Sequence, residues 1–554
     1  NASRVGLRVL KNGGNAVDAA VATAAALGVA EPNSAGVGGG GYFVYYDAGS
    51  GRVHTIDGRE TAPRAMPDDA FIDPETGQPY APFTPNLVTS GVSVGVPGTP
   101  ATWTTALQKW GTKTLRKVIE PAARLAERGF VVDETFREQT EDNEERFAAF
   151  TSSRSLFLRN GLPEVGTRFK NPALARTYRT FAKDPQLFYR GRLPGEIVDA
   201  VRHPPVTDDT TLPVPPGFMK RRDLRDYSVR HQRPTSIDYR GYQVYGMAPS
   251  SSGGSTVGEA LNILENYDLA GMDDAAALHH YLEASALAFA DRGAYVGDPA
   301  YVNTHLRDLL SQKYADERAC LLDPEHAATP KPIPAGDVET YDGECAPAVG
   351  EGASGPDTEG MSTTHLTATD RWGNVVAYTL TIEQTGGSGI VVPRRGFLLN
   401  NELTDFTAIP NDEDPNRIQP GKRPRSSMSP TIVLRNGKPF LALGSPGGST
   451  IITTVLQILF NRIDRGMTIP EAIAAPRASQ RNTPTVTAEP PFMDAYEDLL
   501  APYGHVLVPS GDEFTPQAEI GAATGIEFGP RGLLTAVAEP DRRGGGSALV
   551  VRPK

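Results

Sequence analysis

The chain has 554 residues, of which 39% are hydrophobic and 22% charged, with a net charge of −12 and a pI near 5.4. This composition is typical of a globular protein, and the length favours roughly three or four domains. The negative charge argues against nucleic acid or an anionic membrane as the main partner. The best candidate for a membrane span, Ala16 to Ala30, is too short to cross a bilayer and contains Asp18.

Apolar spacing and flanking Gly and Pro residues predict several elements in the first 300 residues. A buried helix is predicted from Gly14 to Gly28, and four glycines then lead into an aromatic strand from Tyr42 to Tyr46. The other elements expected here are helices Trp103–Trp110, Leu115–Arg128 and Ala275–Arg292, and a connecting loop at Val201–Gly217.

The segment from Asp342 to Gly360 is rich in Gly and Ser and has no large apolar residue after Val349, which predicts a flexible linker. Directly after it, "STTHLTATD" and "NVVAYTLTI" alternate like two strands joined by the turn "DRWGN". Further strands are predicted at "GFLLN", "TIVLRNG" and "PFLALGS", followed by a helix at "PGGSTIITTVLQILF". Strands and helices mix without strict βαβ alternation, which favours an α+β fold over a doubly wound one.

Cysteine and histidine residues give no sign of a metal site. The nine histidines are scattered without an HExxH pattern, and Cys320 and Cys345 match no metal spacing. Two unpaired thiols, or one disulfide in an exported protein, are both compatible with this pair. The chain begins at Asn1 rather than Met, so we expect the natural N-terminus, with any signal peptide, to lie upstream.

Two glycine-rich turns, Gly253-Gly254 and Gly447-Gly448, each precede a predicted helix. Neither has the lysine that a phosphate-binding P-loop requires. Such turns are either tight helix starts with an N-cap, or places where bare backbone N–H groups bind an anion or an oxyanion.

The predicted linker ends at Ser362-Thr363-Thr364, at the start of a strand. A threonine hydroxyl is a poor nucleophile without a base. If the chain is cut before Thr363, the freed α-amine, with a pKa near 8, lies on the same residue and can accept the hydroxyl proton. The alternative is that these are ordinary strand threonines facing solvent.

Longer motifs resemble those of the gamma-glutamyltransferase family. In the first part these are "GLRVLKNGGNAVDAAVATAAALGVAEPNSAGVGGGGYFVYYD", "DGRETAP", "VGVPGTPA", "MAPSSSGGSTVGEALNILENYDLAG" and "ALAFADRGAYVGDP". In the last part they are "TTHLTATDRWGNVVAYTLT", "GFLLNNELTDF", "GKRPRSSMSPTIV" and "GSPGGSTIITTVLQ". The motifs follow the order of the family and span residues 5 to 480.

The resemblance implies an N-terminal-nucleophile hydrolase fold: a four-layer αββα sandwich with two facing, mainly antiparallel sheets. It implies a cut chain in which residues 1–362 form a large segment and residues 363–554 a small one, interleaved in one domain. It also implies hydrolysis of γ-glutamyl amides such as glutathione, or transfer of the γ-glutamyl group to an amino acid or peptide.

Catalytic roles follow from the matched motifs. The resemblance implies self-cleavage between Ser362 and Thr363, with Thr363 then acting as the nucleophile. Thr381, in "YTLT", would orient its hydroxyl. The backbone N–H groups of Gly447 and Gly448 would form the oxyanion hole, in agreement with the second interpretation of that turn.

Donor-binding roles follow in the same way. Arg59, in "DGRE", would bind the donor α-carboxylate together with Ser426 and Ser427 of "RSSMS". A planar guanidinium suits that anion because it can form two parallel hydrogen bonds. Glu402 and Asp405, in "NNELTDF", would hold the donor α-ammonium.

The chain departs from the family pattern in two places. Glu383 stands where members often have Asn, which would add a third carboxylate around the donor ammonium; alternatively, Glu383 points away and pairs with Arg394 or Arg395. The segment from Asp405 to Ser426 is short, as in lidless members, and predicts an open pocket.

Three functions are compatible with these features. The leading hypothesis is a γ-glutamyl hydrolase and transferase that needs no cofactor or metal, acts on glutathione-like donors with water or amino acid acceptors, and is exported. The second is a relative that acts on poly-γ-glutamate or on glutaryl amides. The third is an uncut, inactive surface protein. After self-cleavage, the two fragments are expected to remain associated as a heterodimer.

Overall fold

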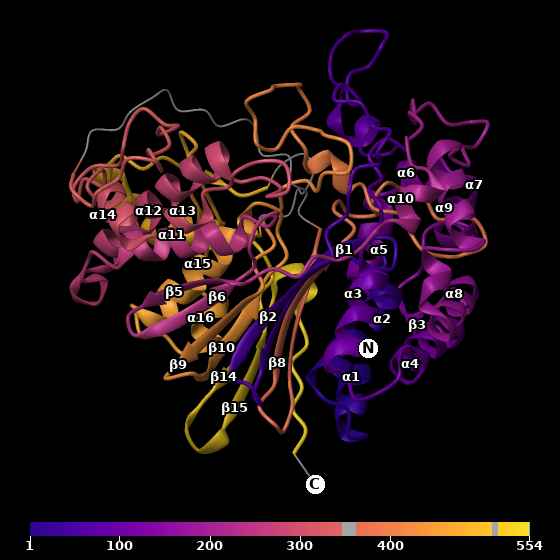
Figure 1. Ribbon diagram of the computed structural model, residues 1–554, viewed down its shortest axis with the longest axis horizontal. Coiled ribbons are helices and arrows are strands. Elements are labelled where there is room, and N and C mark those ends of the chain that lie inside the picture. The colour runs from indigo at the N-terminus through magenta and orange to yellow at the C-terminus, as the bar shows by residue number, and fades with distance from the viewer. Residues whose placement is uncertain (346–361, 512–518, 553–554) are drawn as a thin grey trace. The chain divides into compact units, whose positions relative to one another are not determined.

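The computed structural model describes residues 1–345, 362–511 and 519–552 (Figure 1). Most of the linker predicted between Asp342 and Gly360 therefore lies outside the described residues. Across the described ranges, no helix combines the length and the apolar character needed to cross a membrane.

The chain divides into two compact units, and each unit takes residues from both sides of the predicted cut before Thr363. Unit 1 comprises Asn1–Gln232, Thr358–Pro424 and Ala548–Lys554. Unit 2 comprises Arg233–Asp357 and Arg425–Ser547.

The centre of unit 1 is an antiparallel four-stranded sheet in the order β2-β1-β8-β7. The predicted aromatic strand is β1 (Gly40–Asp47), which pairs with β2 (Arg52–Asp57). The two strands predicted after the linker are β7 (Thr364–Thr369) and β8 (Val375–Thr381). Every residue of β8 is buried, as expected for an inner strand.

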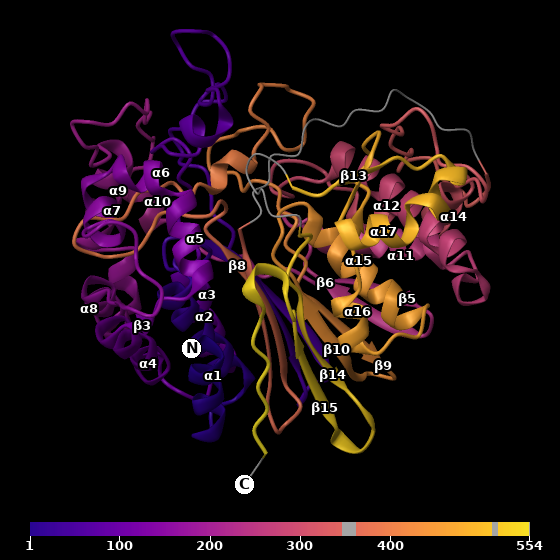
Figure 2. The ribbon, with the colours of Figure 1, turned by 180° about the vertical axis from the view of Figure 1, so that it is seen from behind.

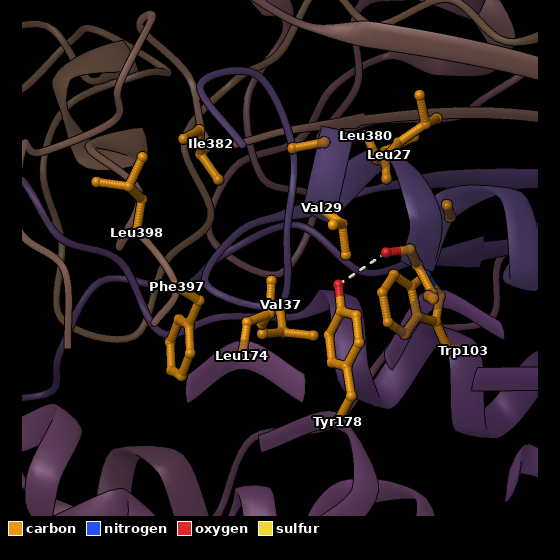
Figure 3. Close-up of a cluster of buried hydrophobic side chains, with 14 of the residues drawn as sticks. Leu27, Val29, Val37, Trp103, Leu174, Tyr178, Leu380, Ile382, Phe397 and Leu398 are labelled. Atoms are coloured by element: carbon orange, nitrogen blue, oxygen red, sulfur yellow. Dashed lines mark hydrogen bonds between the residues drawn. The ribbon is translucent and has the colours of Figure 1, made fainter. Parts of the chain in front are cut away.

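Helix α2 (Ala16–Ala30) is the predicted buried helix, shifted by two residues. It begins with a capping box in which Asn15 and Asp18 each bind the other's backbone N–H. Alanine allows close packing, and α2 contacts α1, α4, β7 and β8. Figure 3 shows its C-terminal end in a buried apolar cluster, where the Tyr178 hydroxyl donates to the Ala25 carbonyl at 2.9 Å.

Helices make up most of the rest of unit 1 (Figure 1). Two of them, α3 and α4, were predicted, and α4 has the predicted bounds. The segment expected to be a loop at Val201–Gly217 is irregular except for its first two residues, which end α9. The helices of unit 1 besides α2 are α1 (Ala2–Lys11), α3 (Thr99–Trp110), α4 (Leu115–Arg128), α5 (Glu134–Asp142), α6 (Glu144–Ala148), α7 (Thr151–Phe157), α8 (Pro172–Lys183), α9 (Leu193–Arg202) and α10 (Arg221–Arg225), with a small hairpin of β3 (Phe130–Val131) and β4 (Arg168–Phe169).

One predicted strand of unit 1 is wrong. The segment "GFLLN" forms only an isolated bridge between Val391 and Leu398. Arg394 and Gly396 have positive φ angles, of 66° and 73°, so the chain turns sharply there. The backbone N–H groups of Asn400 and Asn401 then donate to the carbonyl oxygens of Gly38 and Ile382, both at 3.2 Å, so they extend no ladder from this segment.

Unit 2 contains an antiparallel six-stranded sheet in the order β15-β14-β10-β9-β6-β5. Its strands are β5 (Thr235–Tyr239), β6 (Tyr242–Gly246), β9 (Thr431–Arg435), β10 (Lys438–Gly444), β14 (Thr524–Phe528) and β15 (Leu534–Ala538). Strands β9 and β10 were predicted from "TIVLRNG" and "PFLALGS". A small sheet joins β11 (Ala478–Ser479), β12 (Val486–Ala488) and β13 (Leu507–Pro509).

The helices of unit 2 include two that were predicted, at "PGGSTIITTVLQILF" and at Ala275–Arg292. They are α11 (Gly253–Leu264), α12 (Asp274–Tyr295), α13 (Leu306–Leu309), α14 (Gln312–Ala319), α15 (Thr450–Ile463), α16 (Ile469–Ala474) and α17 (Pro490–Leu500). The main sheets of both units are antiparallel and combine with helices, so the predicted α+β class is confirmed.

The structure decides between the two alternatives for the cysteines. Cys320 and Cys345 form a disulfide, with their Cα atoms 5.4 Å apart. The bond ties the end of α14 to residues near the start of the predicted linker.

Candidate nucleophile and donor site

Thr363 immediately precedes β7 and lies opposite the end of β8. The register that pairs Thr364 with Leu380 brings Thr363 to Thr381, and both side chains are buried. The Thr363 hydroxyl donates to Thr381 Oγ1 at 3.2 Å, and the Thr381 hydroxyl donates to the carbonyl oxygen of Ser362 at 2.9 Å. The predicted nucleophile, its orienting residue and the bond to be cut are therefore linked by hydrogen bonds.

A turn just after α2 holds the residue before the predicted cut. The Ser362 hydroxyl contacts the Asn33 carbonyl oxygen at 3.2 Å and Ser34 Oγ at 3.0 Å. The same turn accepts backbone bonds from Ile382 and Gly386, on the segment that follows Thr381. Sequence reasoning gave Asn33 and Ser34 no role, although both lie in the matched motif "AEPNSAGVGGGG".

His365 is the titratable side chain closest in sequence to Thr363, but its contacts point elsewhere. Its Nδ1 lies 2.8 Å from Thr379 Oγ1 and its Nε2 lies 3.1 Å from Thr367 Oγ1. Burial lowers its pKa to about 3, so the imidazole is neutral at physiological pH and its polar atoms are engaged by the strands. His365 is therefore not placed as the base for Thr363.

Arg59 follows β2 and is fully buried. Its two terminal nitrogens form ion pairs with Glu402 and Asp405, and its Nε donates to the Pro424 carbonyl at 3.2 Å. Burial opposes the charge, but the neighbouring Asp405 carboxylate contributes most to outweighing it, so the pKa of Arg59 is raised. The structure thus brings the predicted carboxylate-binding and ammonium-binding residues into direct contact.

The two carboxylates are placed by a short 3₁₀ helix, Glu402–Asp405. The Asn400 side chain fixes the entry to this helix: its amide donates to the Gly38 carbonyl at 2.6 Å, and its oxygen accepts from the Glu402 backbone N–H at 3.1 Å. Glu402 Oε2 is buried and accepts no hydrogen bond from any described residue, so it retains the capacity to accept one from an ammonium.

Glu383 is joined to the same cluster. Its backbone N–H donates to Thr381 Oγ1 at 2.8 Å, and its carboxylate accepts from the Asn401 side chain, next to Glu402. The φ of Glu383 is 78°, in the region that L-residues rarely adopt. Within the described part of the chain, Glu383 pairs with neither Arg394 nor Arg395, and the Arg395 guanidinium binds Glu196 instead.

A buried arginine lies near Glu383. Arg146 donates to the Thr385 carbonyl at 2.6 Å and also to the Gly387 carbonyl, so it holds the loop that follows β8. Burial lowers the pKa of Arg146 to about 10, and the charge of Glu383 acts in the opposite direction. Sequence reasoning did not identify Arg146.

Glu60, next to Arg59, is a second residue that the sequence did not single out. Its side chain is completely buried, and neither carboxyl oxygen has a hydrogen-bond partner among the described residues. Burial raises its pKa to about 8, although the Arg59 charge acts against this. A carboxyl of this kind is protonated over much of the neutral range.

In unit 2, the turn before α15 contains the two glycines predicted to form an oxyanion hole. Gly447 and Gly448 have φ angles of 138° and 55°. A Cβ on Gly447 would meet Thr450 Oγ1 at 2.7 Å, so a side chain does not fit there. Neither glycine N–H donates to another described residue, which leaves both donors available for an oxyanion.

Ser426 and Ser427, also in unit 2, are buried. They are hydrogen-bonded by Ser252, which precedes α11, and by Arg292 of α12. The Ser252 N–H donates to the Ser426 carbonyl at 2.7 Å. The Arg292 guanidinium donates to Ser252 Oγ and to Ser427 Oγ, both at 2.9 Å. Arg292 lies in the matched motif "ALAFADRGAYVGDP", but sequence reasoning assigned it no role.

The predicted site residues therefore form two groups. In unit 1, hydrogen bonds and ion pairs link Thr363 to Thr381 and Glu383, and Arg59 to its carboxylates. Unit 2 holds the glycine turn and the two serines. That the two groups act on one donor molecule stays a prediction.

Comparison with known proteins identifies the family. The family model described as Gamma-glutamyltranspeptidase matches residues 2–550. The glutathione hydrolase proenzyme of Bacillus subtilis (strain 168) is 41% identical over 86% of this chain and 78% of its own length. The corresponding proenzyme of Escherichia coli (strain K12) is 36% identical over 97% of this chain and 88% of its own length.

Solved structures agree with this assignment. A cephalosporin acylase from Bacillus halodurans has a TM-score of 0.83 and 29% identity, covering 100% of this chain and 94% of its own. The predicted N-terminal-nucleophile hydrolase fold is confirmed by such neighbours. The chain is therefore a member of the gamma-glutamyltranspeptidase family and has the N-terminal-nucleophile hydrolase fold.

Proposed function

We propose that the chain cuts itself between Ser362 and Thr363, and that the freed Thr363 then hydrolyses or transfers γ-glutamyl groups of glutathione-like donors. The observation that carries this proposal is the hydrogen-bond path from the Thr363 hydroxyl through Thr381 to the Ser362 carbonyl. The cut would leave residues 1–362 as the large segment and 363–554 as the small one.

The direction of these two hydrogen bonds supports a balanced cleavage step. Thr363 Oγ1 attacks the Ser362 carbonyl carbon and gives its proton to Thr381 Oγ1, while the Thr381 proton passes to the carbonyl oxygen. The tetrahedral intermediate then collapses: its C–N bond breaks, and the Thr363 nitrogen takes a proton to become an amine. Water hydrolyses the resulting ester, which frees Thr363 and leaves a carboxylate on Ser362.

In the mature enzyme, the α-amine of Thr363 serves as the base. An α-amine with a pKa near 8 accepts the hydroxyl proton, and His365 is neutral and engaged elsewhere. Attack on the γ-glutamyl carbonyl forms an ester with Thr363 and expels the donor amine, which takes the proton back. The N–H groups of Gly447 and Gly448 would stabilise the oxyanion before water or an acceptor amine attacks the ester.

Donor recognition in this proposal depends on the α-amino acid end of the donor. Arg59, with Ser426 and Ser427, would bind the α-carboxylate. Glu402 and Asp405, with Glu383, would surround the α-ammonium. The buried, unpartnered Oε2 of Glu402 supports this role, because a buried carboxylate oxygen without a partner favours a cationic ligand.

A second candidate donor class is the glutaryl amides, which lack the α-amine. It is favoured by the similarity to the cephalosporin acylase structure. The clustered carboxylates argue against it, because without an ammonium they would face no substrate charge. The short Asp405–Ser426 segment also favours long γ-linked chains as donors, since no lid insertion is present in this sequence.

Self-cleavage is tested by Thr363→Ala. We expect this variant to remain a single chain and to be inactive, because it has no hydroxyl to attack Ser362 or the donor. Denaturing gel electrophoresis and N-terminal sequencing of the small fragment provide the measurement. Normal maturation of Thr363→Ala would remove Thr363 from the proposal.

Donor choice is tested with γ-glutamyl and glutaryl anilides. We expect the wild type to prefer the γ-glutamyl compound and Glu402→Gln to narrow that preference by about tenfold, since a charge-assisted hydrogen bond is worth roughly 1.5–3 kcal/mol. Equal kcat/KM for both anilides in the wild type would favour the acylase alternative.

The proposed cellular context follows from the same chemistry. The mechanism uses no cofactor and no metal, and its partners are small γ-glutamyl donors with water or amino acid acceptors. The Cys320–Cys345 disulfide supports export to an oxidising compartment, where such bonds persist.

A further inference from the structure

A groove lies between α1 and α4, two helices that both pack on α2. Figures 1 and 2 show where these helices lie in the chain's fold. The groove encloses about 730 Å³. Apolar side chains line part of it: Val5 and Val9 from α1, and Val118 and Leu125 from α4. Leu125 is half-buried, Val5 and Val9 are each 8% exposed, and Val118 is fully buried behind them. The accessible apolar floor is therefore formed by Leu125 with the edges of Val5 and Val9.

Cationic side chains border this floor on both helices. Arg4 and Arg8 lie one turn apart on α1, and Lys117, Arg124 and Arg128 follow one face of α4. All five are exposed. Lys113 and Arg168 also line the groove, whereas no Asp or Glu does so among the described residues.

The positive charge of the groove is poorly neutralised. Arg124 contacts Glu120 at 3.5 Å. Arg4, Arg8, Lys117 and Arg128 form no ion pair with any residue in the described ranges. In a chain with a net charge of −12, this concentration of cations produces a local positive potential that attracts anionic chains.

The groove is separate from the nucleophile. The Lys113 N–H donates to Asp18 at the start of α2, and the Ala16 N–H donates to Asp370, just beyond the end of β7. Thr363 precedes the other end of β7, a strand of six residues that spans on the order of 20 Å.

We propose that this groove is a secondary binding site for a polycarboxylate chain of γ-linked glutamates, which retains a long donor while one end is cleaved. The proposal rests on the proposed γ-glutamyl activity. A γ-linked chain has methylene groups in its backbone, which match the apolar floor, and one carboxylate per residue, which matches the cationic borders.

The dimensions agree with such a ligand. Helix α4 has 14 residues and is about 21 Å long. One γ-linked residue has five backbone bonds and extends by about 6 Å. Three or so residues therefore fit along the groove. A flat anionic membrane would not reach the recessed Val5 and Val9, and a nucleic acid backbone presents sugars and phosphates rather than consecutive methylene groups.

The test compares two double variants of the same charge. Arg8→Gln/Arg128→Gln removes two cations from the groove, and Lys11→Gln/Arg116→Gln removes two exposed cations from the same helices outside it. Both are made in the uncut Thr363→Ala background, so that the polymer is not consumed. Fluorescently labelled poly-γ-glutamate is titrated at low and high salt.

We expect the groove variant to bind the polymer about fivefold more weakly and the control to bind like its parent, since two exposed ion pairs are lost. The proposal would be overturned if both variants bound the polymer equally more weakly than their parent. It would also be overturned if α-linked polyglutamate, heparin or phosphatidylglycerol vesicles bound as tightly as poly-γ-glutamate and depended on the groove in the same way. In the cleavable background, both variants should hydrolyse a γ-glutamyl anilide at the wild-type rate. A wild type that cleaves no γ-glutamyl donor would refute the proposed function, whereas the binding result addresses the groove alone.

Discussion

Arg59 is a buried guanidinium whose charge is balanced within the protein by Glu402 and Asp405. In the proposed function such a cluster binds a zwitterion, because the donor carboxylate and ammonium can each add to an existing pair of opposite charges. Removing the Arg59 side chain would leave two buried carboxylates without their cationic partner, which would destabilise the folded protein. A substitution that keeps the charge is therefore the better test.

For Arg59→Lys, we expect normal self-cleavage but a clear loss of kcat/KM for γ-glutamyl donors, because an ammonium cannot replace the planar fork. Arg59→Ala should lose roughly 2–4 kcal/mol of transition-state stabilisation. The measurements are steady-state kinetics and the extent of maturation on a gel. Unchanged kcat/KM in both variants would exclude Arg59 from donor binding.

Glu60 allows a prediction about stability. Its pKa is raised from 4.5 to about 8 by burial, so the folded chain holds a proton that the unfolded chain releases between these values. The folded state then binds more protons than the unfolded one, and this group makes stability fall as pH rises from about 4.5 to 8.

Glu60→Gln should remove that pH-dependent loss. Relative to its parent, we expect the variant to gain roughly 2–4 kcal/mol between pH 5 and pH 9, judged from a shift of this size. Urea unfolding of uncut Thr363→Ala chains at both pH values provides the measurement. If the difference in free energy of unfolding between variant and parent were the same at pH 5 and pH 9, Glu60 would already be ionised at pH 5 in the folded chain.

At the scale of elements, the proposed self-cleavage would depend on the end of β8 and on the turn after α2. Strand pairing brings Thr381 to Thr363, and the turn at Asn33–Ser34 binds Ser362. The turn also accepts backbone bonds from Ile382 and Gly386, so it joins the scissile residue to the loop after β8. Cleavage would remove the covalent link from Ser362 to Thr363, so this contact is expected to matter chiefly in the uncut chain.

Ser34→Ala should therefore slow maturation without affecting the mature enzyme. We expect roughly fivefold slower cleavage, the effect of losing a hydrogen bond worth about 1 kcal/mol. The rate is followed on gels, and activity is expressed per cut molecule. Ser362→Ala should have a similar effect, and the double variant should be no slower than either. Ser50→Ala, at an exposed serine, is the control; equal slowing by that variant would count against a specific contact.

At the scale of the whole molecule, the two segments on either side of the cut share both sheets. In unit 1, β1 and β2 precede Thr363 whereas β7 and β8 follow it. In unit 2, β5 and β6 precede it and pair with β9 and the later strands. Separating the segments would break the β1–β8 and β6–β9 pairings and expose two cores.

We therefore expect the cut protein to remain one particle in native conditions. Size-exclusion chromatography with light scattering should give the mass of the whole chain, and the fragments should separate only at denaturant concentrations that also abolish the circular dichroism signal. Release of a folded small segment below that transition would contradict the shared-sheet arrangement.

Several features could be predicted from the sequence because local pattern determines them. Alternating apolar residues around a five-residue turn define β7 and β8, and their pairing fixes the contact between Thr363 and Thr381. An alanine-rich segment with Asn15 and Asp18 at its start defines α2. The glycines of the turn before α15 predict backbone angles that only glycine adopts readily.

Other features were decided by tertiary structure alone. The "GFLLN" segment has a strand composition, but the turn at Gly396 and the distant partners of Asn400 prevent a ladder. The contact of Ser34 with Ser362 joins residues 328 positions apart in the sequence. The pKa of Glu60 is set by complete burial, which its own sequence context does not encode. Local periodicity describes how one element folds, whereas burial and long-range hydrogen bonds depend on how all the elements pack together.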